Sequence, residues 1–274
     1  MRIGWDMEQR NINEYFSRIG LPETTGATIE NLKAIHQHQH RSIPFENFDV
    51  INGQPILLSQ EALHEKLVVN QRGGYCQELN GLLLNVLSHL GFEARSLLGR
   101  VHLAGEPTGR SHRVTLVTID GKQWLVDAGF GTFTPRAPLL LEANLEQNSG
   151  LQNTDLQTFR FIEDELYGLL LQIKQGEEWM NVYSLDMTYV CANDLESSNF
   201  FTSTSPKSIF TSNCIAALPI EDGIVTLLNQ KIKVTKNGST EEWLLEDEAS
   251  YFAALQTYFG LTPNVPFSTL KKCF

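Results

Sequence analysis

The sequence predicts an α+β fold, because the spacing of its hydrophobic residues changes along the chain. Through the first ninety residues, apolar side chains recur every three or four positions, which is typical of amphipathic helices. Beyond residue 91 the spacing becomes two, in short segments rich in β-branched and aromatic residues. The last third combines hairpin signals with one closing helix. We therefore expect a helical region, a β-rich region and a mixed region, in that order.

The helical region contains four expected helices. The first has an apolar face that ends at Gly20, and the second begins after a Thr28 cap. The third begins near Ser59. The fourth begins at Cys76 and ends before Gly91, where glycine supplies a left-handed cap. Its apolar face consists of Leu79, Leu82, Leu83, Val86, Leu87 and Leu90.

The strands of the β-rich region are expected in "HRVTLVTI", "KQWLVDAG", "TFRFIED", "LYGLLLQI" and "WMNVYSLD". A polar stretch, "CANDLESSN", then leads into the last third. There, Asp222-Gly223 and Asn237-Gly238 are tight-hairpin signals between the strands "IAALPI", "IVTLLNQ", "KIKVTK" and "EEWLLE". The closing helix begins near Asp247 and is followed by Gly260.

Composition excludes several classes of protein. The 274 residues include 42% hydrophobic and 19% charged residues, which excludes general disorder, and no apolar run is long enough to span a bilayer. The net charge of -11 argues against a nucleic-acid partner. The N-terminal "MRIGWDMEQRN" lacks the apolar core of a signal peptide, so we expect a cytoplasmic protein without a membrane partner.

The cysteines and histidines give no strong metal signal. Four widely separated cysteines form no C-x-x-C pair, so we expect free thiols. In "HQHQH", His36 and His40 have the spacing of helical metal ligands. A solvated helix face is the preferred interpretation, because no carboxylate or cysteine completes a site. We therefore expect no metal.

Cys76 is a candidate nucleophile because it stands at the start of a helix. Unpaired backbone N–H groups and the positive end of the macrodipole favour a thiolate there. The alternative is a buried cysteine that only packs, since free cysteine is among the most buried residue types.

His112 and Asp127 are the candidate partners of this thiol. Asp120-Gly121 predicts a hairpin between the two strands that carry them, with His112 opposite Gly129 and Val114 opposite Asp127. Positions 112 and 127 are then diagonal neighbours on one face, and Gly129 leaves room for the imidazole. Asp127 would orient the ring while its other nitrogen faces the thiol. A structural His–Asp pair on a sheet is the alternative.

The sequence resembles the arylamine N-acetyltransferase family. The segments that carry the resemblance are "RGGYCQELN" at 72–80, "TGRSH" at 108–112, "WLVDAGFG" at 124–131, "IPFENFD" at 43–49 and "NFFTSTSPKSIFTS" at 199–212. Gln77 departs from the family pattern, which has an aromatic or small residue after the cysteine. The departure concerns the wall of the substrate pocket or local packing, and leaves the triad intact.

The resemblance implies three domains around a Cys-His-Asp core akin to papain-like and transglutaminase-like enzymes. These would be a helical bundle at 1–92 carrying the cysteine, a β-barrel at 93–193 carrying the histidine and aspartate, and an α/β lid at 194–274. It also implies a ping-pong reaction in which Cys76 takes acetyl from acetyl-coenzyme A. An arylamine, arylhydrazine or N-hydroxyarylamine then attacks the thioester.

Further residues are implied by the same resemblance. Phe45 and Phe130 would line the aromatic acceptor pocket, with core packing as the alternative. The residues that match coenzyme A contacts are Thr108, Gly109 and Gly131, with Ser203 and Thr204 of the lid as weaker candidates. A local basic pocket for a phosphorylated cofactor is also open, with Arg72, Arg110, Arg113 and Arg136 as candidates. Surface or salt-bridged arginines are the alternative.

Three other functions use overlapping features. A carrier-dependent amide synthase of the same fold would use the same triad and take its acyl group from a long thioester. A cysteine hydrolase would need a water-accessible acyl-enzyme, whereas an aromatic pocket favours an organic acceptor. A non-catalytic ligand binder would not need all three triad residues.

Overall fold

A computed structural model describes residues 9–141 and 151–274 of the chain. The N-terminal residues 1–8, on which the expectation of a missing signal peptide rested, lie outside the described residues. The helices are α1 (Gln9–Ile19), α2 (Ile29–Ser42), α3 (Phe48–Ile51), α4 (Gln60–His64), α5 (Cys76–His89), α6 (Ala192–Thr204), α7 (Glu248–Phe259) and α8 (Phe267–Leu270). None of the helices within these ranges is long and apolar enough to cross a membrane.

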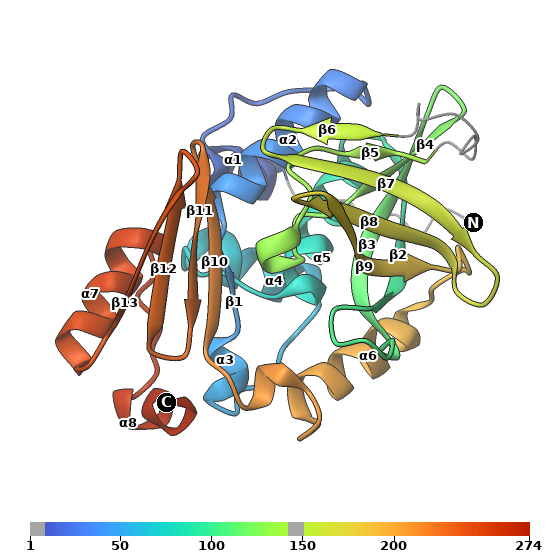
Figure 1. Cartoon of the computed structure of the whole chain (residues 1–274). Coiled ribbons are helices and arrows are strands. Elements are labelled where there is room, and N and C mark those ends of the chain that lie inside the picture. The colour runs from blue at the N-terminus through green and yellow to red at the C-terminus, as the bar shows by residue number, and fades with distance from the viewer. Residues whose placement is uncertain (1–8, 142–150) are drawn as a thin grey trace.

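The larger sheet is antiparallel and curls until its two edges nearly meet (Figure 1). Its eight strands have the order β5-β4-β3-β2-β9-β8-β7-β6. Gln152 of β6 bridges the two edges, because its side chain exchanges hydrogen bonds of 2.6 and 2.9 Å with the backbone of Leu140 in β5. The strand bounds are β2 (Glu93–Val101), β3 (Arg110–Ile119), β4 (Lys122–Val126), β5 (Leu139–Leu140), β6 (Gln152–Thr154), β7 (Gln157–Asp164), β8 (Gly168–Gln175) and β9 (Glu178–Leu185).

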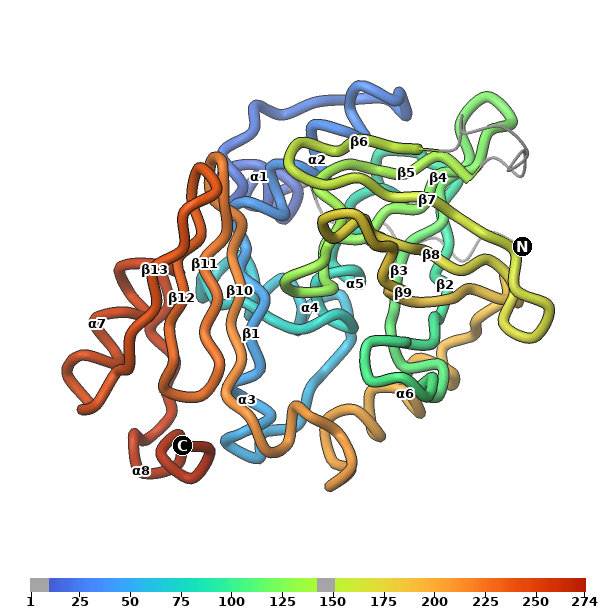
Figure 2. The backbone as a smooth tube through the Cα atoms, in the orientation of Figure 1, coloured from blue at the N-terminus to red at the C-terminus, as the bar shows by residue number. Residues whose placement is uncertain are grey.

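The smaller sheet joins the two ends of the chain. Its order is β1-β10-β11-β12-β13, so β1, from the first fifty residues, pairs with a strand more than 160 residues later. Helix α7 lies along the outer side of this sheet in Figure 2, where the backbone of both sheets can be followed. The bounds are β1 (Phe45–Glu46), β10 (Ile215–Ile220), β11 (Gly223–Leu228), β12 (Lys231–Lys236) and β13 (Ser239–Leu244).

Three hydrophobic clusters form the core. One joins the N-terminal helices and includes Cys76. A second lies between the smaller sheet and α7. The third fills the inside of the curled sheet. Helix α5 packs against β2 and β3 on the outside of that sheet, which brings the candidate nucleophile to the strand that carries His112.

Most local predictions are confirmed. Thr28 and Ser59 cap α2 and α4 with their hydroxyls, Gly91 and Gly260 follow their helices with positive φ, and the Asp120-Gly121 and Asn237-Gly238 turns join strands as expected. The hairpin predicted at Asp222-Gly223 is displaced by one residue, so that its turn consists of Glu221 and Asp222. Gly223 belongs to β11, opposite Ile220, and a Cβ atom there would overlap the carbonyl oxygen of Thr235 on β12.

The polar stretch after residue 190 is a helix, which the sequence did not predict. Helix α6 buries the hydroxyl side chains of Ser198 and Thr202 in place of an apolar stripe. The periodicity of hydrophobic residues is therefore absent, although the backbone is helical.

Candidate active site

Cys76 occupies the first position of α5 and is 5% exposed. The two preceding glycines let the chain approach its neighbours closely. A Cβ atom at Gly73 would overlap the carbonyl oxygen of Pro44, and one at Gly74 would lie 2.8 Å from the Glu78 carboxylate. That carboxylate accepts a hydrogen bond of 3.1 Å from the Tyr75 amide, which completes the turn entering the helix. The "RGGYC" segment thus fixes the place of the thiol.

His112 and Asp127 form a buried pair, as predicted. His112 Nε2 lies 2.7 Å from Asp127 Oδ2, which leaves Nδ1 for Cys76. Burial alone would lower the pKa of His112, but the Asp127 carboxylate and the Cys76 thiol raise it to about 9. The ring is therefore favoured in its protonated form beside the sulfur.

The predicted hairpin register is confirmed from the Ile119–Lys122 pair to the Thr115–Val126 pair, but the ladder is shorter than predicted. Strand β4 ends at Val126, so Asp127 lies just beyond the ladder, and His112 has its backbone pair, Gly99, on the other neighbouring strand, β2. Gly129 makes room for the nucleophile's helix and not for the imidazole. A Cβ atom there would lie 3.1 Å from the Cα of Cys76.

Asp127 accepts four hydrogen bonds from side chains and backbone. Oδ1 receives Asn80 Nδ2 and the Gly129 amide, both at 2.9 Å, and Oδ2 receives His112 and, at 3.1 Å, Tyr183 Oη. Burial alone would raise the pKa of Asp127, but His112, Asn80 and the Gly129 amide hold it below its usual value. The carboxylate thus stays charged and orients the imidazole.

The partners Asn80 and Tyr183 were not predicted. Asn80 lies one helical turn after Cys76, and this i, i+4 spacing is the signal that could have found it. Tyr183 belongs to β9, 56 residues from Asp127, and no local pattern connects them.

Ser111 contributes a backbone carbonyl beside the nucleophile. It has no partner on β2, because the ladder shifts register between Gly99 and Arg100, so β3 bulges at this residue. The freed carbonyl accepts Gln77 Nε2 at 3.0 Å, Ser198 Oγ at 3.3 Å and Cys76 Sγ at 3.8 Å.

Gln77, the departure from the family pattern, is fully buried. Its Nε2 also donates to Ser198 Oγ at 2.8 Å. The amide side chain therefore ties the start of α5 to β3 and to α6. Of the two interpretations of this departure, the pocket wall and local packing, the structure shows local packing.

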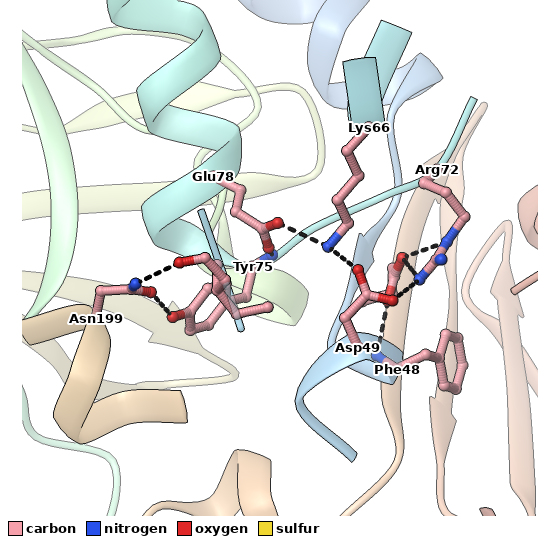
Figure 3. Close-up of polar contacts among 9 residues, drawn as sticks. Phe48, Asp49, Lys66, Arg72, Tyr75, Glu78 and Asn199 are labelled. Atoms are coloured by element: carbon pink, nitrogen blue, oxygen red, sulfur yellow. Dashed lines mark hydrogen bonds and ion pairs between the residues drawn. The ribbon is translucent and has the colours of Figure 1, made fainter. Parts of the chain in front are cut away.

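A second group of charged side chains, buried or half-buried, lies beside the segment that precedes Cys76. This anchor cluster comprises Glu46, Asp49, Lys66, Arg72 and Glu78. Arg72 contacts Glu46 at 2.7 Å and Asp49 at 2.9 Å, and Lys66 contacts Asp49 and Glu78, each at 2.7 Å. Figure 3 shows Lys66 between the carboxylates of Asp49 and Glu78.

The same close-up shows how this segment reaches α6. The Tyr75 hydroxyl donates to Asn199 Oδ1, and Asn199 Nδ2 donates to the carbonyl of Ile56 at 2.9 Å (Figure 3). Asn199 of α6 therefore joins Tyr75, the residue before the nucleophile, to the backbone at Ile56.

The two predicted aromatic pocket residues have different surroundings. Phe130 is partly buried, and its ring packs edge-on against His112 with centroids 4.6 Å apart. Phe45 is 7% exposed and belongs to the hydrophobic cluster that contains Cys76. Its ring is the nearest group to Gly131, at 3.8 Å from a Cβ built there.

The predicted coenzyme residues are only partly brought together. Gly109 lines an open cavity of about 300 Å³ together with Leu98, Arg110, Ser111, Asp194, Ser197, Ser198 and Phe201. Thr108 precedes it and contacts Ser111 Oγ at 3.1 Å. Ser203 and Thr204 lie in the last turn of α6, where their hydroxyls donate to carbonyls of the preceding turn.

Of the four candidate arginines, one lines this cavity. Arg110 does so and also contacts Asp186 at 3.2 Å. Arg72 is engaged in the anchor cluster, and Arg136 contacts Asp155 at 3.2 Å and two backbone carbonyls. Arg113 is buried at 5% exposure.

The prediction of a solvated "HQHQH" face is wrong. His36, Gln39 and His40 are buried. His36 Nε2 lies 2.7 Å from the carbonyl oxygen of Asp127, and Gln39 Nε2 donates to that of Leu79 at 2.9 Å. His36 and Gln39 can be buried because they satisfy backbone groups of the Asp127 turn and of α5.

Comparison with known proteins agrees with this geometry. The N-acetyltransferase family model matches residues 28–266. An arylamine N-acetyltransferase of Escherichia coli (strain K12) is 36% identical over 254 residues, covering 91% of this chain and 88% of that protein. The structure of the Salmonella typhimurium arylamine N-acetyltransferase has a TM-score of 0.90 at 32% identity and covers 98% of this chain and 100% of that chain. The structure of the Mycobacterium marinum arylamine N-acetyltransferase in complex with CoA has a TM-score of 0.83 at 36% identity. It covers 91% of this chain and 92% of that chain. The chain therefore belongs to the arylamine N-acetyltransferase family.

Proposed function

We propose that this protein transfers an acetyl group from acetyl-coenzyme A, through a Cys76 thioester, to an aromatic amine, hydrazine or N-hydroxyarylamine. The observation that carries the proposal is the chain from Asp127 through His112 to Cys76 at the start of α5. The family supports the reaction class. One relative, from Salmonella typhimurium, is named as both an arylamine N-acetyltransferase and an N-hydroxyarylamine O-acetyltransferase.

In the first half-reaction, the Cys76 sulfur attacks the acetyl carbonyl carbon. A carbon–sulfur bond forms, the bond from that carbon to the coenzyme sulfur breaks, and the protonated His112 supplies a proton to the departing thiolate. The Cys76 amide, at the first position of the helix, has no acceptor within it and is a donor for the oxyanion.

In the second half-reaction, the acceptor nitrogen attacks the thioester carbonyl. His112 takes the proton that the nitrogen loses, and Cys76 leaves as a thiolate, which restores the starting charges. Asp127 holds His112 Nε2 throughout, so that Nδ1 faces the reacting atoms.

We propose Phe45 and Phe130 as walls of the acceptor pocket, and Thr108, Gly109, Gly131, Ser203 and Thr204 as coenzyme contacts. The edge contact of Phe130 with His112 supports its role, because a ring bound there would lie beside the thioester. The cavity at Gly109 and Ser111 supports the coenzyme side, since the Ser111 carbonyl contacts the Cys76 sulfur. We also propose that the protein works on small molecules in the cytoplasm, with no metal, nucleic acid or membrane partner.

The test follows the acyl-enzyme itself. The protein is incubated with acetyl-coenzyme A, its intact mass is measured, and peptide mapping locates the adduct. We expect one acetyl group on Cys76, discharged by an arylamine faster than by buffer alone. An adduct on the exposed Cys191 would overturn the role of Cys76, and no adduct would favour the carrier-dependent synthase. Equal discharge rates with and without amine would favour a hydrolase.

A further inference from the structure

Arg113 is a buried cation without a carboxylate in contact. Its Nε donates to Ser96 Oγ at 3.1 Å, and its Nη1 donates to the backbone carbonyl of Gln77 at 3.0 Å. Among the described residues, no ion pair joins it to an acidic side chain. Because an unpaired charge is costly to bury, such a residue needs a compensating negative group nearby.

The guanidinium lies beside the first two turns of α5, since it contacts the carbonyl of Gln77, the second residue of this helix, and lies against Gly81, the sixth. Gly81 permits the approach, since a Cβ atom there would lie 2.7 Å from Arg113 Nη1. A Cβ atom there would also lie 2.8 Å from Leu63 Cδ1, so Gly81 makes room for both side chains.

The nearby carboxylates have other partners. Glu78, in the same helical turn, is held by Lys66 and the Tyr75 amide. Asp127 is held by His112, Asn80, Tyr183 and the Gly129 amide. Asp194, in the cavity beside Ser111, accepts from the Cys191 amide, and Arg110 of the same cavity contacts Asp186. Tyr75, His36 and Cys76 are further titratable groups near the start of α5.

Cys76 is therefore the group whose negative charge can offset Arg113. Burial lowers the pKa of Arg113 to about 10, and the charge of Cys76 is the interaction that opposes this. The side chains of His112 and Arg113 follow one another on β3, so they point to opposite faces of the strand. Arg113 reaches α5 at the Gln77 carbonyl, one residue after Cys76, whereas His112 contacts the thiol directly from the other face of the strand.

We propose that Arg113 is a positioning residue that acts as the second counter-charge of the Cys76 thiolate, beside His112. The inference rests on Cys76 being the nucleophile of the proposed function. With the thiolate formed, Asp127 and Cys76 carry two negative charges and His112 and Arg113 two positive ones. When the thioester forms, the thiolate charge and the imidazolium charge disappear together, and Arg113 remains. Departure of Cys76 in the second half-reaction then restores its partner, which favours deacylation.

The test measures the reactivity of the Cys76 thiolate without acetyl transfer. Arg113→Met removes the charge and keeps the length, and the rate of Cys76 alkylation by iodoacetamide is measured from pH 5 to 9. We expect the rate near neutral pH to fall by about tenfold or more and the profile to move to higher pH. Arg113→Lys, which restores a cation, should recover most of the loss. Arg95→Met is the matched control, because Arg95 lies on the neighbouring strand β2 and donates to the Met187 carbonyl.

Thermal unfolding is measured for the same variants, because Arg113→Met also removes the hydrogen bonds to Ser96 Oγ and to the Gln77 carbonyl. A loss of stability without a change in the alkylation profile would show a purely structural role. A folded Arg113→Met protein with the alkylation profile of the wild type would overturn the proposal. If that variant does not fold, Gly81→Ala decides, because the added methyl displaces Nη1 and keeps the charge in the chain. A shift of the Cys76 alkylation profile of Gly81→Ala to higher pH supports the proposal, and an unchanged profile rejects it.

Alkylation needs neither acetyl-coenzyme A nor an arylamine. A shifted profile together with no acetyl adduct would therefore reject the proposed function and leave the role of Arg113 standing.

Discussion

The anchor cluster and the triad both bury charge beside Cys76, and they differ in how that charge is balanced. In the anchor cluster, Glu46, Asp49 and Glu78 each contact Lys66 or Arg72 at 2.7 to 2.9 Å. In the triad, Asp127 contacts His112, and the sulfur becomes charged only when a proton has moved. The comparison teaches that the anchor cluster holds the backbone before Cys76, whereas the triad carries the charge that changes in the proposed reaction.

The largest expected effect is loss of activity in Asp127→Asn. The variant removes the acceptor that orients His112 and stabilises its positive charge, and the analogous change in a serine triad costs about 10⁴ in rate. Single-turnover acetylation of Cys76 by acetyl-coenzyme A measures the effect. Stability should fall as well, because a buried protonated His112 loses its counter-charge, although the amide oxygen can still accept from Asn80 and Gly129. A folded variant with near-normal acetylation would show that Asp127 does not orient the ring.

In the anchor cluster the expected effect is on the stability of the fold. Arg72→Met leaves Glu46, which is fully buried, and Asp49 with fewer cations, and breaking a buried ion pair costs about 3 to 5 kcal/mol. We expect this loss in the free energy of unfolding, measured by urea denaturation. Lys231→Met is the control, since the exposed Lys231–Glu242 pair should contribute at most about 1 kcal/mol. Equal effects of the two substitutions would mean that the anchor cluster does not stabilise the fold.

The same contrast shows what the sequence could predict. The glycines and the apolar periodicity after Cys76 are local, and so is the Asp120-Gly121 turn that brings His112 and Asp127 together. The anchor cluster assembles residues 46 to 78 through tertiary contacts, and no spacing within the sequence indicates it. His36 was assigned to solvent because its partner, the Asp127 carbonyl, lies 91 residues away. The boundaries at 92 and 193 stay a prediction.

The triad and the anchor cluster should also lose their contributions to the free energy of unfolding at opposite ends of the pH scale. The pKa of His112 is raised from 6.5 to about 9, so its contribution is complete below pH 6.5 and is lost as the pH rises through about 9. Burial would raise the pKa of Asp49, but Lys66 and Arg72 lower it below 3.8. Its contribution is therefore complete above pH 3.8 and is lost as the pH falls through the lowered value.

Urea denaturation across this range tests both directions. His112→Gln should flatten the fall in stability between pH 6.5 and 9, and Asp49→Asn should flatten the fall below pH 3.8. If His112→Gln changed the stability only below pH 3.8, the assignment of the raised pKa to His112 would be wrong.

The smallest expected effect is on the choice of acceptor and comes from Phe130. This uncharged residue belongs to neither the anchor cluster nor the triad. Its ring contacts His112 and Tyr183 and leaves every ion pair in place when it is removed. Phe130→Ala should therefore retain thiolate reactivity and reduce the preference for an aryl hydrazine over an alkyl hydrazine of similar basicity. The expected loss of discrimination is about 1 to 3 kcal/mol, measured as the ratio of kcat/KM values. Matching the basicity of the two hydrazines removes the advantage that aryl amines have by remaining unprotonated at neutral pH. An unchanged ratio would assign Phe130 to packing around His112, and the preference would then reflect the acceptor's basicity alone.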